Sequence, residues 1–326
     1  MTAIDRIPEL LEQGAAFDAE YRGGLSDHRP MALLALARLG ASAARLADFA
    51  RRYSARLQPA PPHAAWPAGE AWASHLGQRQ AWPIYRDLFL QWLSHEDAGE
   101  VLQQALPRLM QGVGAAAFHG LIRTAYAVQG RRRQELADAL AYWACRWLDL
   151  GSASAAAGTG RSTDAQAVLR QLRASASDAD LIFQRMQTAA QQARFQTTAD
   201  RLQVGPDTLA QLATLAAMAY AASGNFTALH LVTSAHAMRL LLPYVDQPQA
   251  AVQAYWRAFA AAVCASGLQA GEAPPARPWP ELLALALASD DEHVIKLVDS
   301  CREEQRAYGG ALVWQQAATR ACLGAA

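Results

Sequence analysis

The sequence has little charge, few cysteines and hardly any lysine. Charged residues make up 18% of its 326 positions, and 29 basic residues balance 29 acidic ones. Because neither sign is in excess, the chain lacks the long-range field that steers proteins to nucleic acid or anionic membranes, and we expect neither as a partner. The cysteines are far apart and form no CxxC pair, which excludes the usual patterns of a disulfide framework or a zinc knuckle.

Long apolar runs are also missing. The apolar stretch at residues 31–37 ends in an arginine, far short of the ~20 residues that a membrane-spanning helix needs. The first twenty residues carry six charged side chains and no continuous apolar segment, unlike a secretory signal. We therefore expect a cytoplasmic protein without a membrane span.

Nucleotide-binding glycine motifs are absent too, since neither Gly-x-Gly-x-x-Gly nor a loop ending in Gly-Lys-Ser/Thr occurs. What the sequence does have is apolar residues, 52% of the chain, recurring with a period near 3.6. The clearest stripe advances in steps of four, three, four and three along one helical face: Leu136, Leu140, Trp143, Trp147 and Leu150.

Three stretches rich in proline, glycine or small residues, 58–69, 151–160 and 269–280, indicate loops. Because helical patterns flank each of them, we interpret them as connections within one body. The sequence therefore predicts an all-α fold, a single large helical domain spanning residues 1–326.

Two histidines stand in contexts that suit a buried ligand. His28 follows Ser26 and Asp27 at the predicted start of an apolar helix, where it could point into the body. His119 follows a run of alanines that leaves room for a ligand or a metal ion. The alternatives are a capping contact for His28 and a hydrogen-bonded core histidine for His119.

His230 and His236 are six residues apart. At ~100° per residue, a regular helix places their side chains about 120° apart, which suits two ligands of one ion poorly. A π-bulge, or a new helix start at Thr233 or Ser234, would bring the rings together. Without such a bend, one of the two supports the site without binding the ion.

Lys296 is the only lysine, against 28 arginines. This usage suggests a sequence that takes arginine wherever a plain positive charge serves, so the exception indicates a need for an amine. A buried amine can lose its proton and add CO2 to become an anionic carbamate ligand, whereas a guanidinium cannot. Lys296 lies between Ile295 and Leu297, one turn after His293. The alternative is a chance lysine on a solvated face.

These residues lie in stretches that resemble the questin oxidase-like family, whose members include fungal enzymes that oxidatively open anthraquinone-type rings. The matching stretches are residues 20–33, 118–126, 230–239 and 293–297, in order along the chain. The resemblance implies an all-helical fold and flavin-independent oxidation. One branch of the family uses iron held by four histidines and a carboxylated lysine.

Carried over to this sequence, the resemblance implies four nitrogen ligands and one modified ligand: His28, His119, His230, His236 and Lys296. His293 is then a supporting residue or an alternative ligand, and which of His230, His236 and His293 bind directly stays open. The implied metal is Fe(II), which suits imidazole and anionic oxygen donors.

The implied reaction is O2-dependent cleavage of, or Baeyer–Villiger-type insertion into, an aromatic or quinone-like small molecule, with NADPH as an optional reductant. Arg123 is expected to stabilise an anionic phenolate or enolate, and Tyr21 or Tyr126 to donate to oxygen. Two alternatives remain, a zinc-dependent hydrolase or lyase and a helical binding protein for a flat hydrophobic ligand. The substrate and the oligomeric state are left open.

Overall fold

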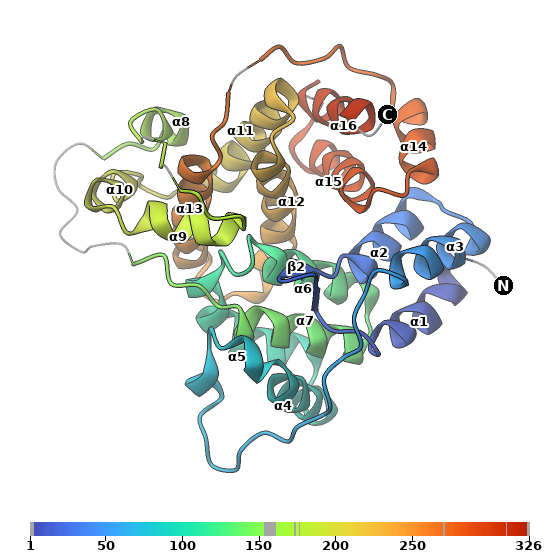
Figure 1. Ribbon diagram of the computed structural model, residues 1–326. Helices are drawn as coiled ribbons and strands as arrows, with labels where there is room; N and C mark the ends of the chain where they lie inside the picture. The colour runs from blue at the N-terminus through green and yellow to red at the C-terminus, as the bar shows by residue number, and fades with distance from the viewer. Residues whose placement is uncertain are drawn as a thin grey trace.

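The computed structural model describes residues 3–152, 161–172, 174–175, 177–269, 271–310 and 312–324. Over these residues it has sixteen α-helices and one short two-stranded hairpin, packed as a single helical domain (Figure 1). The all-α prediction is therefore confirmed, while the expected domain limits of 1–326 stay a prediction. No helix in the described part of the chain has the length and apolar character needed to cross a membrane.

The first half of the chain holds helices α1 to α7 and the hairpin. Their bounds are α1 Ala3–Gly14, β1 Glu20–Tyr21, β2 Leu25–Ser26, α2 Arg29–Leu39, α3 Ala43–Ser54, α4 Trp82–His95, α5 Ala98–Leu109, α6 His119–Gly130 and α7 Arg133–Cys145. The second half holds α8 Ala165–Leu169, α9 Ile182–Ala190, α10 Ala193–Ala199, α11 Thr208–Ser223, α12 Phe226–Leu241, α13 Pro248–Ala265, α14 Trp279–Ala288, α15 Glu292–Tyr308 and α16 Val313–Gly324. Four short 3-10 helices lie between them, at Trp72–His75, Arg79–Ala81, Met110–Gly112 and Leu242–Tyr244.

Local capping explains where two of the central helices begin. The Asn225 side chain accepts hydrogen bonds from the backbone amides of Thr227 and Ala228 at the start of α12. The Asp291 side chain accepts from the amide of His293 at the start of α15. Each cap satisfies amides that have no partner inside the helix and thereby fixes the first turn.

The stripe predicted over residues 136–150 is only partly helical. Leu136, Leu140 and Trp143 are buried on α7, but that helix ends at Cys145. Beyond the end, the Trp147 indole donates to the carbonyl of Arg108, which holds the chain against another segment. The helical spacing of apolar residues therefore continues beyond Cys145, where the helix ends, and a tertiary contact holds the segment that follows.

The predicted loops are largely confirmed. Residues 58–69 contain no helix, and residues 271–278 are extended or irregular before α14 begins at Trp279. The prediction for residues 151–160 falls mostly on residues 153–160, which lie outside the described residues.

Four helices in the centre of the domain pack against one another in a cycle. Helix α2 contacts α6, α6 contacts α12, α12 contacts α15, and α15 contacts α2 (Figure 1). Each carries a histidine near its N-terminal end: His28 precedes α2, His119 opens α6, His230 lies just past the first turn of α12, and His293 is the second residue of α15. The packing thus brings together side chains that are far apart in the sequence.

Candidate metal centre

Four imidazole rings form a closed cluster, which we call the histidine ring: His28, His119, His230 and His293. The Nε2 atoms of His28 and His119 lie 2.6 Å apart. The ring centroid of His119 is 4.9 Å from that of His230, and the centroid of His230 is 5.7 Å from that of His293. His293 closes the cluster at 4.7 Å from His28. The four rings therefore lie against one another in a single cluster.

Two of these rings are oriented by backbone carbonyls. The Nδ1 atom of His119 lies 2.5 Å from the carbonyl oxygen of Ala116, and the Nδ1 atom of His230 lies 2.8 Å from that of Phe226. A carbonyl only accepts, so Nδ1 carries the proton in both rings and Nε2 has the lone pair, which in His119 faces His28 Nε2 at 2.6 Å. This is the arrangement in which a metal-binding histidine is usually held.

A left-handed turn places His119. Ala116, Ala117 and Phe118 have φ angles of 47°, 55° and 70°, a conformation that residues other than glycine rarely adopt. Each such residue costs of order 1 kcal/mol. The turn is buried and ends where α6 begins, so the fold maintains this strain at the segment that aims His119.

Several buried polar atoms of the cluster have no hydrogen-bond partner among the described residues, namely Lys296 Nζ, His28 Nδ1 and His293 Nε2. The Lys296 side chain is fully buried, with 0% of its surface exposed. Leaving an ammonium unpaired in such a place is costly, and burial lowers the pKa of Lys296 to about 8. An amine that loses its proton and binds CO2 would relieve that cost, so the donor set fits a metal ion with an anionic oxygen ligand.

Three rings of the cluster, those of His28, His119 and His230, are uncharged at neutral pH. Burial, followed by the nearby Lys296 ammonium, lowers the pKa of His28 well below its usual value and that of His119 to about 3. Burial and the neighbouring ring of His119 likewise lower the pKa of His230 well below 6.5. Neutral imidazole is the form that binds metal ions.

These lowered pKa values predict that the metal-free protein loses stability in acid. Between pH 6.5 and about 3 the unfolded chain protonates His119 and the folded chain does not. The free energy of unfolding then falls by up to about 1.4 kcal/mol per pH unit for each such histidine. Denaturant unfolding of chelator-treated protein at several pH values measures this slope.

The matched variants are His119→Gln, which removes one ring of the cluster, and His63→Gln, which removes an exposed histidine. We expect the slope of the unfolding free energy against pH to decrease by the contribution of one proton in His119→Gln and to stay the same in His63→Gln. An identical slope in the wild type and His119→Gln would contradict a neutral His119 in the folded chain.

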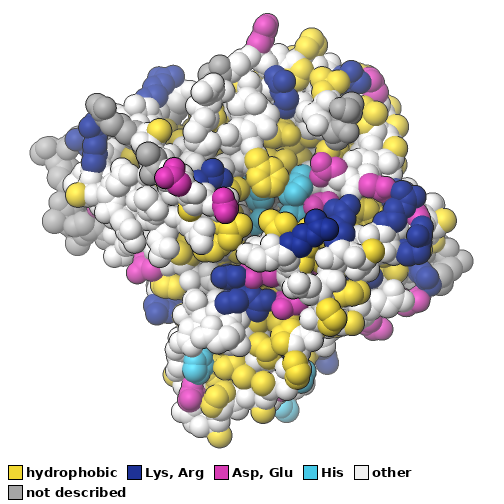
Figure 2. All heavy atoms as spheres, in the orientation of Figure 1, with side chains coloured by type: hydrophobic (Ala, Val, Ile, Leu, Met, Phe, Trp, Pro, Cys, Tyr) yellow, Lys and Arg dark blue, Asp and Glu magenta, His cyan; other side chains and the backbone are white. Residues whose placement is uncertain are grey.

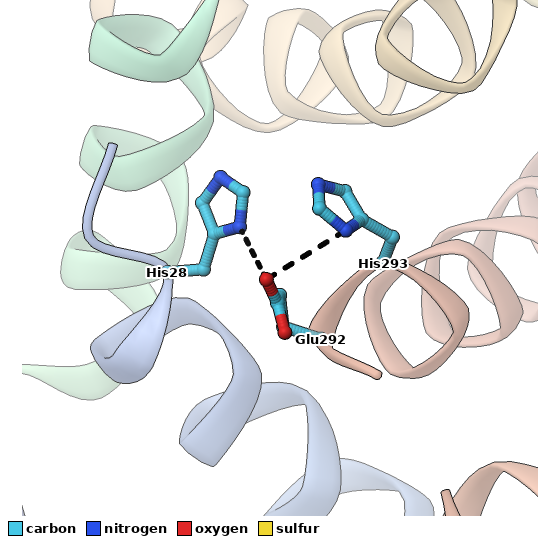
Figure 3. Close-up of side chains that lie close together, drawn as sticks. All are labelled: His28, Glu292 and His293. Atoms are coloured by element: carbon cyan, nitrogen blue, oxygen red, sulfur yellow. Dashed lines mark ion pairs between the residues drawn. The ribbon is translucent and has the colours of Figure 1, made fainter. Parts of the chain in front are cut away.

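Glu292 is a site residue that the sequence did not reveal. Its Oε1 atom lies 3.5 Å from His28 Nδ1 and 3.8 Å from His293 Nδ1 (Figure 3). One ligand atom from each of these three residues lies within 4.8 Å of the others. The only sequence signal was its place beside His293 in the first turn of a helix that also bears Lys296. The Glu292 carboxylate is therefore a source of anionic oxygen beside two rings of the cluster.

The structure does not bring His236 to the histidine ring. Helix α12 runs unbroken through both histidines, so the two side chains leave it in different directions as a regular helix requires. The Nδ1 atom of His236 lies 2.6 Å from Glu304 Oε1, and its Nε2 atom lies 3.3 Å from Arg38 Nη2. Both ring nitrogens are thus engaged with protein groups. His293, the alternative ligand named from the sequence, lies in the cluster where His236 was expected, and the suggested π-bulge or second helix start does not occur.

Two of the three expected catalytic side chains also lie elsewhere. Arg123 forms a buried pair with Glu135, with Nε and Nη2 at 2.7 and 3.0 Å from its carboxylate oxygens. The Tyr126 hydroxyl donates to Asp299 at 2.8 Å. Neither residue is among those that line the cavity described next, so the geometry does not support their expected contacts with substrate and oxygen. Tyr21 does line that cavity.

A cavity of about 320 Å³ opens beside the histidine ring. Its polar wall holds the four histidines and Glu292, and its apolar wall holds Leu25, Leu181, Ile182, Phe183 and Phe226. Figure 2 shows histidine side chains at the bottom of a hollow near the centre of one face. The volume lies in the range of small-molecule sites.

Comparison with known proteins identifies a family. A family model described as Questin oxidase-like matches residues 25–301, a range that contains the histidine ring, Glu292 and Lys296. No curated protein matches the chain.

Proposed function

The chain belongs to the questin oxidase-like family, and we propose that it is a metal-dependent oxidoreductase that uses O2 to oxidise a flat aromatic or quinone-like small molecule. The family description supports the oxidation. The observation that carries the metal dependence is the histidine ring, in which four helices bring four imidazoles together with the buried amine of Lys296 near them.

The ion would be held by the histidine ring together with one anionic oxygen, from Glu292 or from the carbamate of Lys296. Imidazole with a carboxylate-type oxygen suits Fe(II), which when bound supplies the one-electron chemistry that O2 needs to react with a closed-shell organic molecule. The protein supplies the remaining condition, a shaped cavity with one polar and one apolar wall.

The side chains that line the cavity favour a substrate with a flat aromatic ring. The centroid of the Phe226 ring is 4.7 Å from that of His230 and 4.9 Å from that of His293. This aromatic side chain therefore connects the mouth of the cavity with the histidine ring. Apolar residues on the opposite wall exclude water from the face of a bound ring. Tyr21 is the hydroxyl-bearing aromatic residue of the lining, and we propose that it donates a hydrogen bond to a substrate oxygen.

The number of electrons that the reaction consumes determines whether it requires a reductant. Insertion of one oxygen atom into the substrate reduces the other atom to water and consumes two electrons and two protons, so it requires a reductant such as NADPH. Addition of both oxygen atoms to the substrate consumes no external electrons. We propose NADPH as a diffusing reductant in the first case, because the chain has no dinucleotide-binding glycine motif.

The test pairs metal content with oxygen uptake in three proteins: the wild type, His293→Asn and His236→Asn. After loading with Fe(II) under nitrogen and removal of free metal, the wild type should retain about one iron per chain and consume O2 when a hydroxyanthraquinone probe and NADPH are added. His293→Asn should lose iron affinity by at least about tenfold, whereas His236→Asn should keep iron in the fraction that remains folded.

Two outcomes would contradict the proposal. Tight retention of zinc with no oxygen consumption would favour a hydrolase or lyase. Binding of the flat probe without any retained metal would favour a non-catalytic binding protein. Equal iron loss in both variants would contradict the choice of His293 over His236.

A further inference from the structure

Arg185 is a cation without a counterion at the cavity beside the histidine ring. It lies on α9 and is the one lysine or arginine among the described residues that line the cavity. Its Nε atom is buried and has no hydrogen-bond partner in the described part of the chain. Its guanidinium also forms no ion pair with any residue that the structure describes.

Several other buried or half-buried arginines of this chain have a partner. Arg86 bonds to Asp138 at 2.6 Å, Arg123 to Glu135 at 2.7 Å, and Arg79 to Glu20 at 2.9 Å. Arg29 forms no ion pair but donates to the carbonyl of Leu10. Arg185, in contrast, has neither a carboxylate nor a carbonyl partner among the described residues, and it lines the cavity beside the histidine ring.

The acidic residues of the cavity do not neutralise Arg185. Glu292 faces the His28 and His293 rings, and its other oxygen lies 3.4 Å from Arg56. Asp180 is exposed at the mouth. Arg185 therefore remains the one lysine or arginine of the described lining, without a partner among the described residues.

Large apolar side chains are exposed at the mouth of the cavity, where an apolar part of the substrate would cover them. Phe226 and Leu25 are 53% and 44% exposed, which is unusual for large apolar residues of this chain, and both line the cavity. Phe183 lies on the same helix as Arg185 and also faces the cavity. A flat ring system would cover these side chains and remove their apolar surface from water.

We propose that Arg185 orients the substrate by binding an anionic oxygen, a phenolate or a carboxylate, carried on a flat aromatic ring system. The planar guanidinium offers two parallel N–H donors that match such an oxygen group. This assignment deepens the proposed function, since it names the charge and shape of the substrate at the same site. It replaces Arg123, which the sequence suggested for this role.

The test uses binding alone, with chelator-treated protein under nitrogen, so that no metal or oxygen is involved. Calorimetry would compare three probes with the same skeleton: an anthraquinone carboxylate, its neutral carboxamide and a hydroxyanthraquinone at a pH where it is ionised. Arg185→Gln should weaken the binding of one or both anions by about tenfold or more, and that of the carboxamide by no more than about twofold.

Two further variants make the result specific. Arg185→Lys should restore part of the lost affinity because it keeps the charge but loses the paired donors. Arg194→Gln removes an exposed arginine on the neighbouring helix α10 and should change no affinity. If only one anion depends on Arg185, that anion identifies the substrate group.

The proposal is overturned if Arg185→Gln weakens all three probes equally, if it changes none of them, or if the wild type binds no probe. These results are separate from the fate of the oxidase proposal. If the wild type binds the anions through Arg185 but retains no iron, the proposed metal-dependent reaction is contradicted and the role of Arg185 is supported.

Discussion

Replacing Lys296 by arginine is expected to abolish metal binding although it keeps the positive charge. The side chain is fully buried, and its ammonium lowers the pKa of the rings of His28, His119 and His230, which places it close to all three. A guanidinium at this position cannot lose its proton, so it would hold a permanent charge against the incoming cation. We expect iron retention to fall to less than about a tenth of the wild-type value.

The chemistry behind this prediction is the addition of CO2 to the neutral amine. A bond forms between Nζ and the carbon of CO2, one proton leaves for solvent, and the side chain ends in an anionic oxygen group. With a pKa of about 8, a small fraction of Lys296 is neutral at near-neutral pH and can react. Metal binding then draws the remaining amine into the modified form.

Two variants separate the charge of Lys296 from its reactivity, Lys296→Met and Glu292→Gln. If the carbamate is the oxygen ligand, Lys296→Met should lose iron as Lys296→Arg does, while Glu292→Gln should retain most of it. Wild-type iron content in Lys296→Met would show that the amine is not needed and would transfer the oxygen donor to Glu292. Far-ultraviolet circular dichroism checks that each variant folds.

Removing Arg123 is expected to cost the fold about 3–5 kcal/mol, the range for breaking a buried ion pair. Both members of the Arg123–Glu135 pair are buried, with 4% of each side chain exposed. Burial alone would lower the pKa of Arg123, but the attraction to Glu135 and to the nearby Asp27 outweighs this effect and raises the pKa. In Arg123→Met the carboxylates of Glu135 and Asp27 would remain buried without this cation.

Denaturant unfolding of Arg123→Met, Glu135→Leu and the double variant measures the effect as a cycle. The double variant should be more stable than Arg123→Met, because it removes the stranded Glu135 carboxylate together with its partner. A folded Arg123→Met of wild-type stability that binds the anthraquinone probes more weakly would contradict this account and restore Arg123 as a substrate-binding residue.

The fold was predictable because helical periodicity is a local property. Spacing near 3.6 predicted helices, and proline-rich stretches predicted the breaks between them. The end of α7 was not predictable from spacing, since the contact of Trp147 with Arg108 that accompanies it is a tertiary one. The family resemblance named three of the four histidines in the ring as ligands and gave His293 as a supporting residue or an alternative ligand.

The choice between His236 and His293 shows where sequence reasoning reached its limit. The angle between His230 and His236 on a regular helix already argued against both binding one ion, and the structure follows that argument. Which histidine takes the fourth place depends on how α15 packs against α2 and α12, and no local pattern contains that information.

Arg185 and Glu292 were missed for related reasons. Arg185 lies in the region between residues 151 and 205, where no resemblance guided the interpretation, and only the position of α9 at the cavity gives it a role. Glu292 looks like an ordinary acidic residue in the first turn of a helix, a position that favours negative charge in any protein. Both residues acquire their meaning from neighbours that are distant in the sequence.

The most direct test of the metal centre is an anomalous difference map from crystals of the iron-loaded protein, recorded at the iron absorption edge. The account predicts one strong peak enclosed by His28, His119, His230 and His293, with an oxygen of Glu292 or of a carboxylated Lys296 completing the set. A map without a peak at this point, or with a peak held by His236 and Glu304, would contradict it.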